Sequence, residues 1–188
     1  MKMIVLFLKP EWMRKYIYIF FLFPLLFLSC ALPHHINTDK HARFIKNVPF
    51  YPQKLYHCGP ASLAGVLNYW KLPVTQDDVA DAIYSKTAKG TLNIDMLAYV
   101  EKKGFKVKQF KSSISDIPTH INSGYPLIVM VDYGLWRYQK NHFMVIVGYN
   151  NNGAYVNSGE KNLMFINFNK LYNIWKKTNF WTMLITPW

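Results

Sequence analysis

The 188-residue sequence predicts an α+β domain in which N-terminal helices pack on an antiparallel sheet. Three observations support this fold class. Segments with a helical hydrophobic period occupy the first half of the chain, short strand-like segments occupy the second half, and turns such as Asn150-Asn-Asn-Gly153 separate the strands. Hydrophobic residues make up 51% of the chain and aromatic residues 17%, which excludes a disordered protein.

The chain begins with a segment that has the layout of a secretory signal. Arg14 and Lys15 precede an uncharged apolar run over residues 16–28, and Ser29 and Cys30 follow it. This layout resembles the signal of bacterial lipoproteins, which implies that Cys30 is lipidated and that Ala31 favours sorting to the outer membrane. We therefore expect residues 1–30 to be a leader, and the protein to be exported and anchored in the membrane, facing the periplasm.

An uncleaved transmembrane helix is the alternative for this leader. Phe27 stands where lipoprotein signals usually carry Leu, Val or Ile, although the apolar run is shorter than the roughly 20 residues that cross a bilayer. Met13 with the basic pair after it would by itself open a short signal. This suggests that Met1 is an upstream start and that residues 1–12 are not translated.

The rest of the chain divides into a tether and one folded domain. Residues 31–46 show no hydrophobic period and predict a tether, and residues 47–188 form the predicted domain. Apolar residues at helical spacing predict a first helix near Pro60. These residues are Leu63, Val66, Leu67 and Trp70.

The remaining elements follow from capping signals and from alternation. A capping-box-like start at Thr75 predicts a helix to about Tyr84, and another helix runs from Asn93 to Gly104. Strands are predicted at 107–110, 126–131, 143–149, 154–157, 163–166 and 181–185, with short helices at 115–122 and 168–175.

Charge and ligand patterns exclude several function classes. The formal net charge is +12, but no nucleic-acid-binding motif accompanies it, so we expect solvated lysines and no nucleic-acid partner. His34 and His35 lack further ligands at metal spacing, so we expect no metal, and no other cofactor is indicated.

Cys58 is the candidate nucleophile. It lies at the start of the first predicted helix, where the helix dipole and free backbone N–H groups stabilise a thiolate and lower the pKa of the thiol. Gly59 and Pro60 allow the backbone to turn sharply there. If lipidation consumes Cys30, Cys58 has no disulfide partner.

A thiol nucleophile needs a base and a group that orients the base. His142 begins a strand whose one face meets the first helix, and Asn157 ends the following strand. Gln53, on the loop before Cys58, can donate to an oxyanion alongside the Cys58 backbone N–H. Each residue alone also fits a structural role, but their order and their placement on a helix and two strands favour catalysis.

Together, these residues resemble the bacteriocin-processing, double-glycine-type cysteine peptidases, a papain-like family, and in particular its stand-alone lipoprotein members. The resemblance spans residues 48–159 and rests on Gln53, Cys58-Gly-Pro-Ala-Ser62, His142, Val147-Gly-Tyr149 and Asn157. It implies a papain-like peptidase fold with a nucleophile, a base, an oxyanion-hole glutamine and a third residue at the four candidate positions.

The sequence departs from this family at three positions. Members often have Asp at the position of Asn157, Pro at that of Ser158 and an acidic residue at that of His57. Asn is acceptable by analogy with papain-like Cys-His-Asn sites, whereas the role of His57 stays open.

We therefore expect a membrane-tethered cysteine peptidase that takes a peptide or protein substrate. A catalytically inert peptide-binding lipoprotein domain is the alternative, although the presence of Cys58, His142 and Gln53 counts against it. Trp136 and Tyr138 either line a substrate groove or cover the core. The sequence does not determine the substrate, the cleavage site or the oligomeric state.

Overall fold

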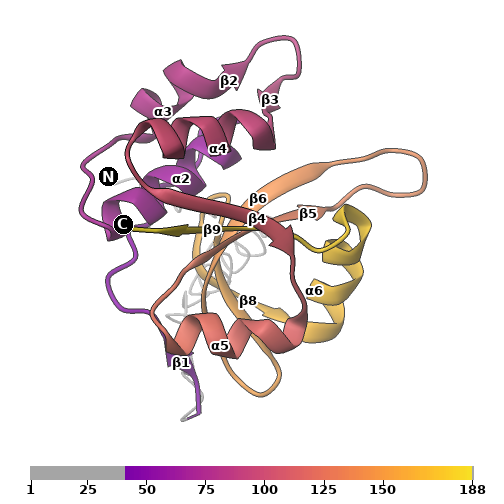
Figure 1. Ribbon diagram of the computed structural model, residues 1–188. Helices are drawn as coiled ribbons and strands as arrows, with labels where there is room; N and C mark the ends of the chain where they lie inside the picture. Colours follow the sequence, from indigo (N-terminus) through magenta and orange to yellow (C-terminus); the bar gives the residue numbers. More distant parts are fainter. Residues whose placement is uncertain (1–40, 188) are drawn as a thin grey trace, which may run out of the picture. The chain divides into compact units, whose positions relative to one another are not determined.

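A computed structural model describes residues 41–187 of the chain (Figure 1). The predictions for the leader, for lipidation at Cys30 and for the tether up to residue 40 therefore lie outside the described residues.

The described residues are built around a seven-stranded antiparallel sheet with the order β4-β9-β5-β6-β7-β8, to which β1 adds by pairing with β6 (Figure 1). The strands are β1 (Arg43–Phe44), β4 (Lys106–Lys111), β5 (Leu127–Asp132), β6 (Asn141–Tyr149), β7 (Gly153–Ser158), β8 (Lys161–Asn167) and β9 (Trp181–Thr186). A separate small hairpin joins β2 (Tyr84–Ser85) to β3 (Gly90–Thr91).

Helices cover the sheet on both faces. They are α2 (Cys58–Tyr69), α3 (Gln76–Ile83), α4 (Asn93–Lys102), α5 (Ile117–Asn122) and α6 (Phe168–Trp175), with 3-10 turns at η2 (Ile114–Asp116) and η3 (Lys176–Thr178). The predicted capping box is present at α3, where the Thr75 side chain accepts from Asp78 N and the Asp78 carboxylate accepts from Thr75 N.

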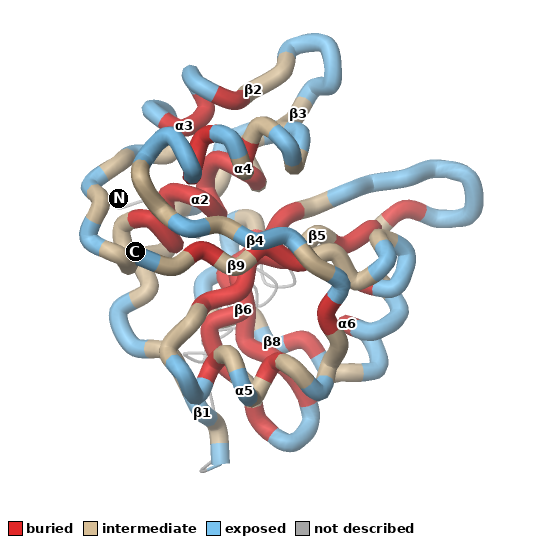
Figure 2. The backbone as a smooth tube through the Cα atoms, viewed as in Figure 1, coloured by how far each residue is buried: buried red, intermediate tan, exposed pale blue. Residues whose placement is uncertain are grey.

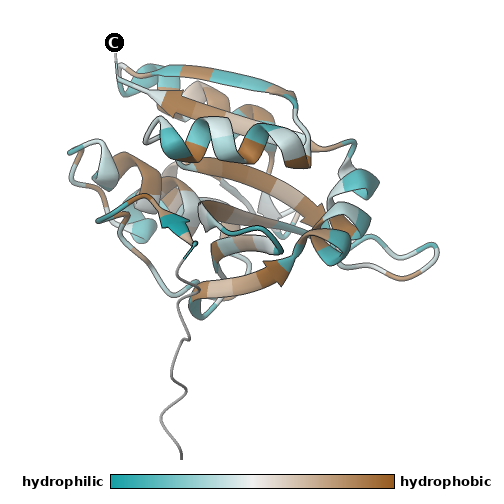
Figure 3. Ribbon diagram, turned by 90° about the horizontal axis from the view of Figure 1, so that it is seen from below, coloured by the Kyte–Doolittle hydropathy of each residue, from teal (hydrophilic) through white to brown (hydrophobic). Residues whose placement is uncertain are grey.

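The alternation of β6 explains why there are two cores. Successive strand residues point to opposite faces, so Phe143 and Val145 pack in one cluster while Met144 and Ile146 pack in the other. The first cluster includes residues of α2, α3 and α4, and the second includes residues of α5 and α6. Figure 2 shows the strands β5 and β6 and the helix α2 as mostly buried and the edge strand β4 as mostly exposed, and Figure 3 shows much of the sheet as apolar.

The predicted order of helices followed by an antiparallel sheet is confirmed. The structure adds β1 and the β2–β3 hairpin, because two-residue strands carry no readable alternation. It also starts α2 at Cys58, two residues before Pro60. At Gly148, a side chain would bring its Cβ within 2.5 Å of the Phe44 ring, so glycine is required for β1 to lie against β6.

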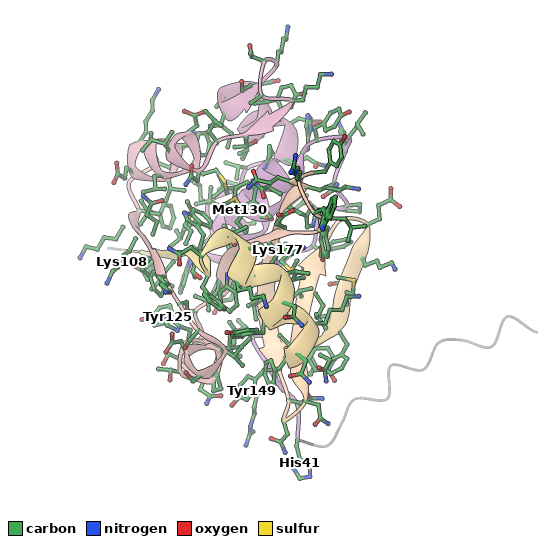
Figure 4. The ribbon with its side chains drawn as sticks, turned by 90° about the vertical axis from the view of Figure 1, so that its right-hand side faces the viewer. His41, Lys108, Tyr125, Met130, Tyr149 and Lys177 are labelled. Atoms are coloured by element: carbon green, nitrogen blue, oxygen red, sulfur yellow. The ribbon has the colours of Figure 1, made fainter. Side chains whose placement is uncertain are left out.

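The loop that joins β5 to β6, residues 133–140, projects from the body and is mostly exposed (Figures 1 and 2). Trp136 and Tyr138 are 102% and 85% exposed, so these aromatic residues do not cover the core. The base of the loop is held by η3, where Lys177 Nζ donates to the Gly134 carbonyl at 2.7 Å; Figure 4 labels Lys177 beside Met130 of β5.

Candidate active site

Cys58 is the first residue of α2 and is partly exposed. Two contacts fix the loop that leads into it: Gln53 N donates to the Gly159 carbonyl at 3.0 Å, and Lys54 Nζ pairs with Asp77 at 2.6 Å. Tyr56 then adopts a left-handed φ of 63°, which turns the chain into the helix. The nucleophile is therefore held between α3 and the turn after β7.

The hairpin strand β3 lies directly against the start of α2. A Cβ at Gly59 would lie 2.9 Å from Cβ of Thr91, which is shorter than a normal contact. Glycine after Cys58 therefore lets the hairpin approach the nucleophile, a role that the sequence did not indicate.

Burial raises the pKa of the Cys58 thiol, and this effect outweighs the backbone N–H groups of Phe143, Gly59 and Cys58 itself, which lower it. The N–H groups at the helix start thus act in the predicted direction, but the prediction that the Cys58 pKa is lowered overall is wrong. The physical reason is that burial destabilises the thiolate by more than the hydrogen bonds from the N–H groups stabilise it. The Cys58 thiol is therefore protonated near pH 7.

His142 is the second residue of β6, and its ring is half-buried. Its pKa is lowered to about 4, first because burial disfavours the imidazolium and second because of the charge of Lys140. The imidazole is therefore neutral near pH 7 and available to accept a proton.

A serine hydroxyl meets the His142 ring. Ser158 Oγ lies 2.8 Å from His142 Nε2, and the ring of Tyr133 lies 5.7 Å from the His142 ring between centroids. The Tyr133 hydroxyl is also hydrogen-bonded to the Ser158 side chain, which partly offsets the rise that burial causes in the Tyr133 pKa. Sequence reasoning missed both residues; the only signal was that Ser158 departs from the family's usual Pro.

Asn157 is buried and makes a different contact. Its Oδ1 accepts a hydrogen bond from Leu163 N at 3.2 Å, across the β7–β8 hairpin. The paired register places Asn157 opposite Val145, three residues from His142 along β6. The structure thus places Asn157 beside the site, with its carbonyl oxygen committed to β8.

Two adjoining hollows connect the four candidate residues. A groove of about 790 Å³ is bordered by Gln53, Cys58 and His142, and we call it the Cys58 groove. A small cavity of about 20 Å³ lies next to it and is bordered by Gln53, Cys58 and Asn157. Ser158 also lines the small cavity. The four predicted site residues are therefore brought together around one thiol.

Three buried side-chain atoms have no hydrogen-bond partner within the described residues, and all belong to segments next to Cys58: Gln53 Oε1, His57 Nδ1 and Thr91 Oγ1. The Gln53 amide is therefore free of competing contacts at its oxygen and borders the thiol. The ring of His57 faces Tyr84 at 5.4 Å, so His57 packs under the hairpin.

Within residues 41–187, no group of three or more His, Cys, Asp or Glu side chains is arranged to hold a metal ion. No helix in the same range has the length and apolar character needed to span a bilayer.

The helices, the antiparallel sheet and the thiol–imidazole groove define a papain-like cysteine-peptidase-type domain. The model of the Peptidase C39-like family matches residues 45–182, and the chain belongs to this family. The family predicted from the sequence and the papain-like fold are thereby confirmed. No curated protein sequence shows a significant match to the chain.

Solved structures with this fold include a C39-like peptidase from Bacillus anthracis, with 16% identity, a TM-score of 0.67 and coverage of 78% of this chain and 98% of that chain. The peptidase domain of Streptococcus ComA, a bifunctional ABC transporter involved in a quorum-sensing pathway, has 21% identity, a TM-score of 0.63 and coverage of 75% and 99%. A double-glycine-motif protease from an AMS/PCAT transporter, in complex with a leader peptide, has 23% identity, a TM-score of 0.62 and coverage of 78% and 95%. These identities support a shared fold.

Proposed function

We propose that this chain is a cysteine peptidase that hydrolyses peptide bonds with Cys58 as the nucleophile and His142 as the base. The observation that carries the proposal is that Gln53, Cys58 and His142 border one groove in a chain of the C39-like family. The backbone N–H of Phe143 also interacts with the Cys58 sulfur, which links the base-bearing strand β6 to the nucleophile.

The reaction starts from a neutral pair. Because Ser158 engages Nε2 of His142, the other ring nitrogen, Nδ1, takes the Cys58 proton as the sulfur attacks the substrate carbonyl carbon. The resulting oxyanion accepts hydrogen bonds from the Cys58 backbone N–H and from the Gln53 side-chain amide. His142 then gives its proton to the leaving amine, and water hydrolyses the thioester and restores the thiol.

The Cys58 groove fits a peptide with apolar side chains. Leu55 and Leu92 border it and are 76% and 47% exposed, so the groove presents apolar surface to solvent. The similar transporter protease was solved with a leader peptide, which supports a peptide as the substrate class here. Small residues such as glycine before the cleaved bond are part of this proposal, by analogy with double-glycine proteases.

The groove also favours acidic residues in the substrate. Lys89 and Lys140 are exposed at its rim, and no Asp or Glu is among the described residues that line it. A carboxylate near Lys140 would offset the charge that lowers the His142 pKa, so an acidic substrate would also make the base stronger.

The test of activity is hydrolysis of a library of peptides by the full-length chain, with Cys58→Ala and His142→Ala as matched variants. Cleavage that both substitutions abolish supports the proposal. Binding of the same peptides by wild type with no cleavage would instead identify an inert peptide-binding domain.

We also propose that Cys30 is lipidated and that the domain faces the periplasm, anchored in the outer membrane. The basis is the sequence of the leader, from Arg14 to Ala31. Labelled palmitate should enter the wild-type protein and should not enter Cys30→Ser. A wild-type protein that is recovered unlabelled and uncleaved would indicate a simple membrane helix.

A further inference from the structure

We propose that Ser158, held in place by Tyr133, is the positioning residue for His142, in the role that the sequence assigns to Asn157. This inference rests on the proposed peptidase function and adds how the base is oriented.

The first support is which atoms are in contact. Ser158 Oγ lies 2.8 Å from His142 Nε2, whereas the side-chain oxygen of Asn157, Oδ1, accepts a hydrogen bond from Leu163 N. Ser158 is the last residue of β7 and is 8% exposed, so water competes little for its hydroxyl.

The second support is a donor and acceptor count. A serine hydroxyl has one hydrogen, and because the bond between Ser158 and Tyr133 lowers the Tyr133 pKa, Ser158 donates that hydrogen to the Tyr133 oxygen. Ser158 Oγ then accepts from His142 Nε2–H with a lone pair. Tyr133 N donates to the Lys140 carbonyl at 3.0 Å, which holds the tyrosine at the end of β5. This arrangement selects the tautomer with hydrogen on Nε2 and leaves the Nδ1 lone pair free for the thiol proton.

The third support is the set of charged and titratable groups around His142. Lys140 lies on the loop beside it, Tyr133 lies on the end of β5, and Cys58 comes from α2. Asp132 is close in sequence to Tyr133, but its Oδ1 accepts from the backbone N of Gly134 and of Lys140. A hydroxyl therefore orients the ring, and the charge of the imidazolium is not balanced by a contacting carboxylate in the described residues.

This role predicts a specific kinetic pattern. Ser158→Ala should lower kcat by roughly 10–10²-fold with little change in KM, because the base is misplaced by a fraction of an ångström to about 1 Å. Ser158→Thr retains a hydroxyl and should recover most of the loss. Tyr133→Phe keeps the ring and removes the second bond, so its loss should be smaller than that of Ser158→Ala.

The decisive measurement is the ¹⁵N NMR signal of the His142 ring in the full-length protein, assigned by comparison with His142→Ala. In wild type the signals should show hydrogen on Nε2, and in Ser158→Ala they should shift toward a mixture of tautomers. Asn157→Ala is the matched control, and it should leave the tautomer and the pH profile of kcat unchanged while lowering thermal stability through the lost bond to Leu163.

Two results would overturn the proposal. One is a His142 tautomer that is the same in wild type and in Ser158→Ala. This measurement tests the proposal even if the chain cleaves no peptide. The other is a loss of kcat in Asn157→Ala that equals or exceeds the loss in a folded Ser158→Ala. Absence of peptide cleavage by wild type, with the tautomer shift present, would reject the proposed function and support the Ser158 contact.

Discussion

The two halves of β6 differ in how they are paired, although they form one continuous strand. From Val145 to Tyr149 the strand pairs with β7, and it pairs with β1 at its end. From Asn141 to Met144 it pairs with β5 but not with β7. Both halves contribute to both cores, but only the half without β7 also carries His142 and directs the Phe143 N–H to the Cys58 sulfur.

This difference shows how the sheet supplies a site without losing its core. A backbone edge released from pairing has N–H groups that can meet a ligand or a side chain. The released half stays in the sheet because it still pairs with β5 along its length. We therefore expect a division of roles along β6, in which the chemistry depends on the half without β7 and substitutions in the other half change stability alone.

The largest expected effect separates the two halves directly. His142→Ala should lower kcat by roughly 10⁴-fold or more while leaving the melting temperature nearly unchanged, because it removes the base. Ile146→Val, in the paired half, should lower the free energy of unfolding by about 0.5–1.5 kcal/mol without changing kcat. Peptide hydrolysis and thermal unfolding measure both. A large loss of kcat in folded Ile146→Val would contradict the division.

The oxyanion contribution should be next in size. Gln53→Ala should lower kcat by roughly 10²–10³-fold with a modest change in KM, as loss of one oxyanion donor does. Gln109→Ala is the control, because Gln109 lies on the exposed strand β4 and contacts Trp181. Equal activity in Gln53→Ala and wild type would remove Gln53 from the site.

Acid stability should report the burial of His142. Its folded-state pKa of about 4 lies below the ordinary value of about 6.5, so its contribution to stability is present above pH 6.5 and is lost as pH falls through 4. The loss is on the order of 2–3 kcal/mol, reduced by the part of the ring that water reaches. Urea unfolding at several pH values should show a weaker pH dependence in His142→Gln than in wild type over this window.

Alkylation should show a thiol with a raised pKa. The rate with iodoacetamide should keep rising above about pH 8.5, because burial holds the Cys58 pKa above its ordinary value. His142→Ala should leave the midpoint nearly unchanged, since the neutral ring contributes no charge to the thiolate. A plateau already reached at mildly acidic pH would instead reveal a preformed thiolate–imidazolium pair.

The smallest expected effect concerns the rim of the groove. Lys89→Glu should weaken binding of an acidic peptide several-fold, and added salt should reduce the difference from wild type, because exposed charges interact weakly and are screened. Lys170→Glu on α6 changes the net charge equally and lies outside the groove lining. If both variants weaken binding equally, the effect comes from net charge and not from the groove.

Part of this architecture could be predicted because it depends on local patterns. The helical stripe around Leu63, the capping box at Thr75 and the alternation of β6 each extend over enough residues to be recognised. The two-residue strands β1 and β2 were missed because they form only through their partners, and pairing between distant segments leaves no local pattern.

The site was predicted less completely than the fold. Gln53, Cys58, His142 and Asn157 were all expected near one another, and they border two adjoining hollows. The contact of His142 with Ser158 was not expected, because adjacent residues in a strand differ only in the face they point to. The bulge between Val156 and Ser158 in the β7–β8 pairing changes that direction, and no residue type signals it.

The sequence by itself determined the order of helices and strands, the family, and the position of a cysteine at a helix start. Only the tertiary structure decided the protonation state of the site and the partner of the base. The physical reason is that pKa values and hydrogen-bond partners depend on what surrounds a group in space. Segments far apart in the chain bury Cys58 and His142. This burial raises the Cys58 pKa, against the local expectation, and lowers the His142 pKa.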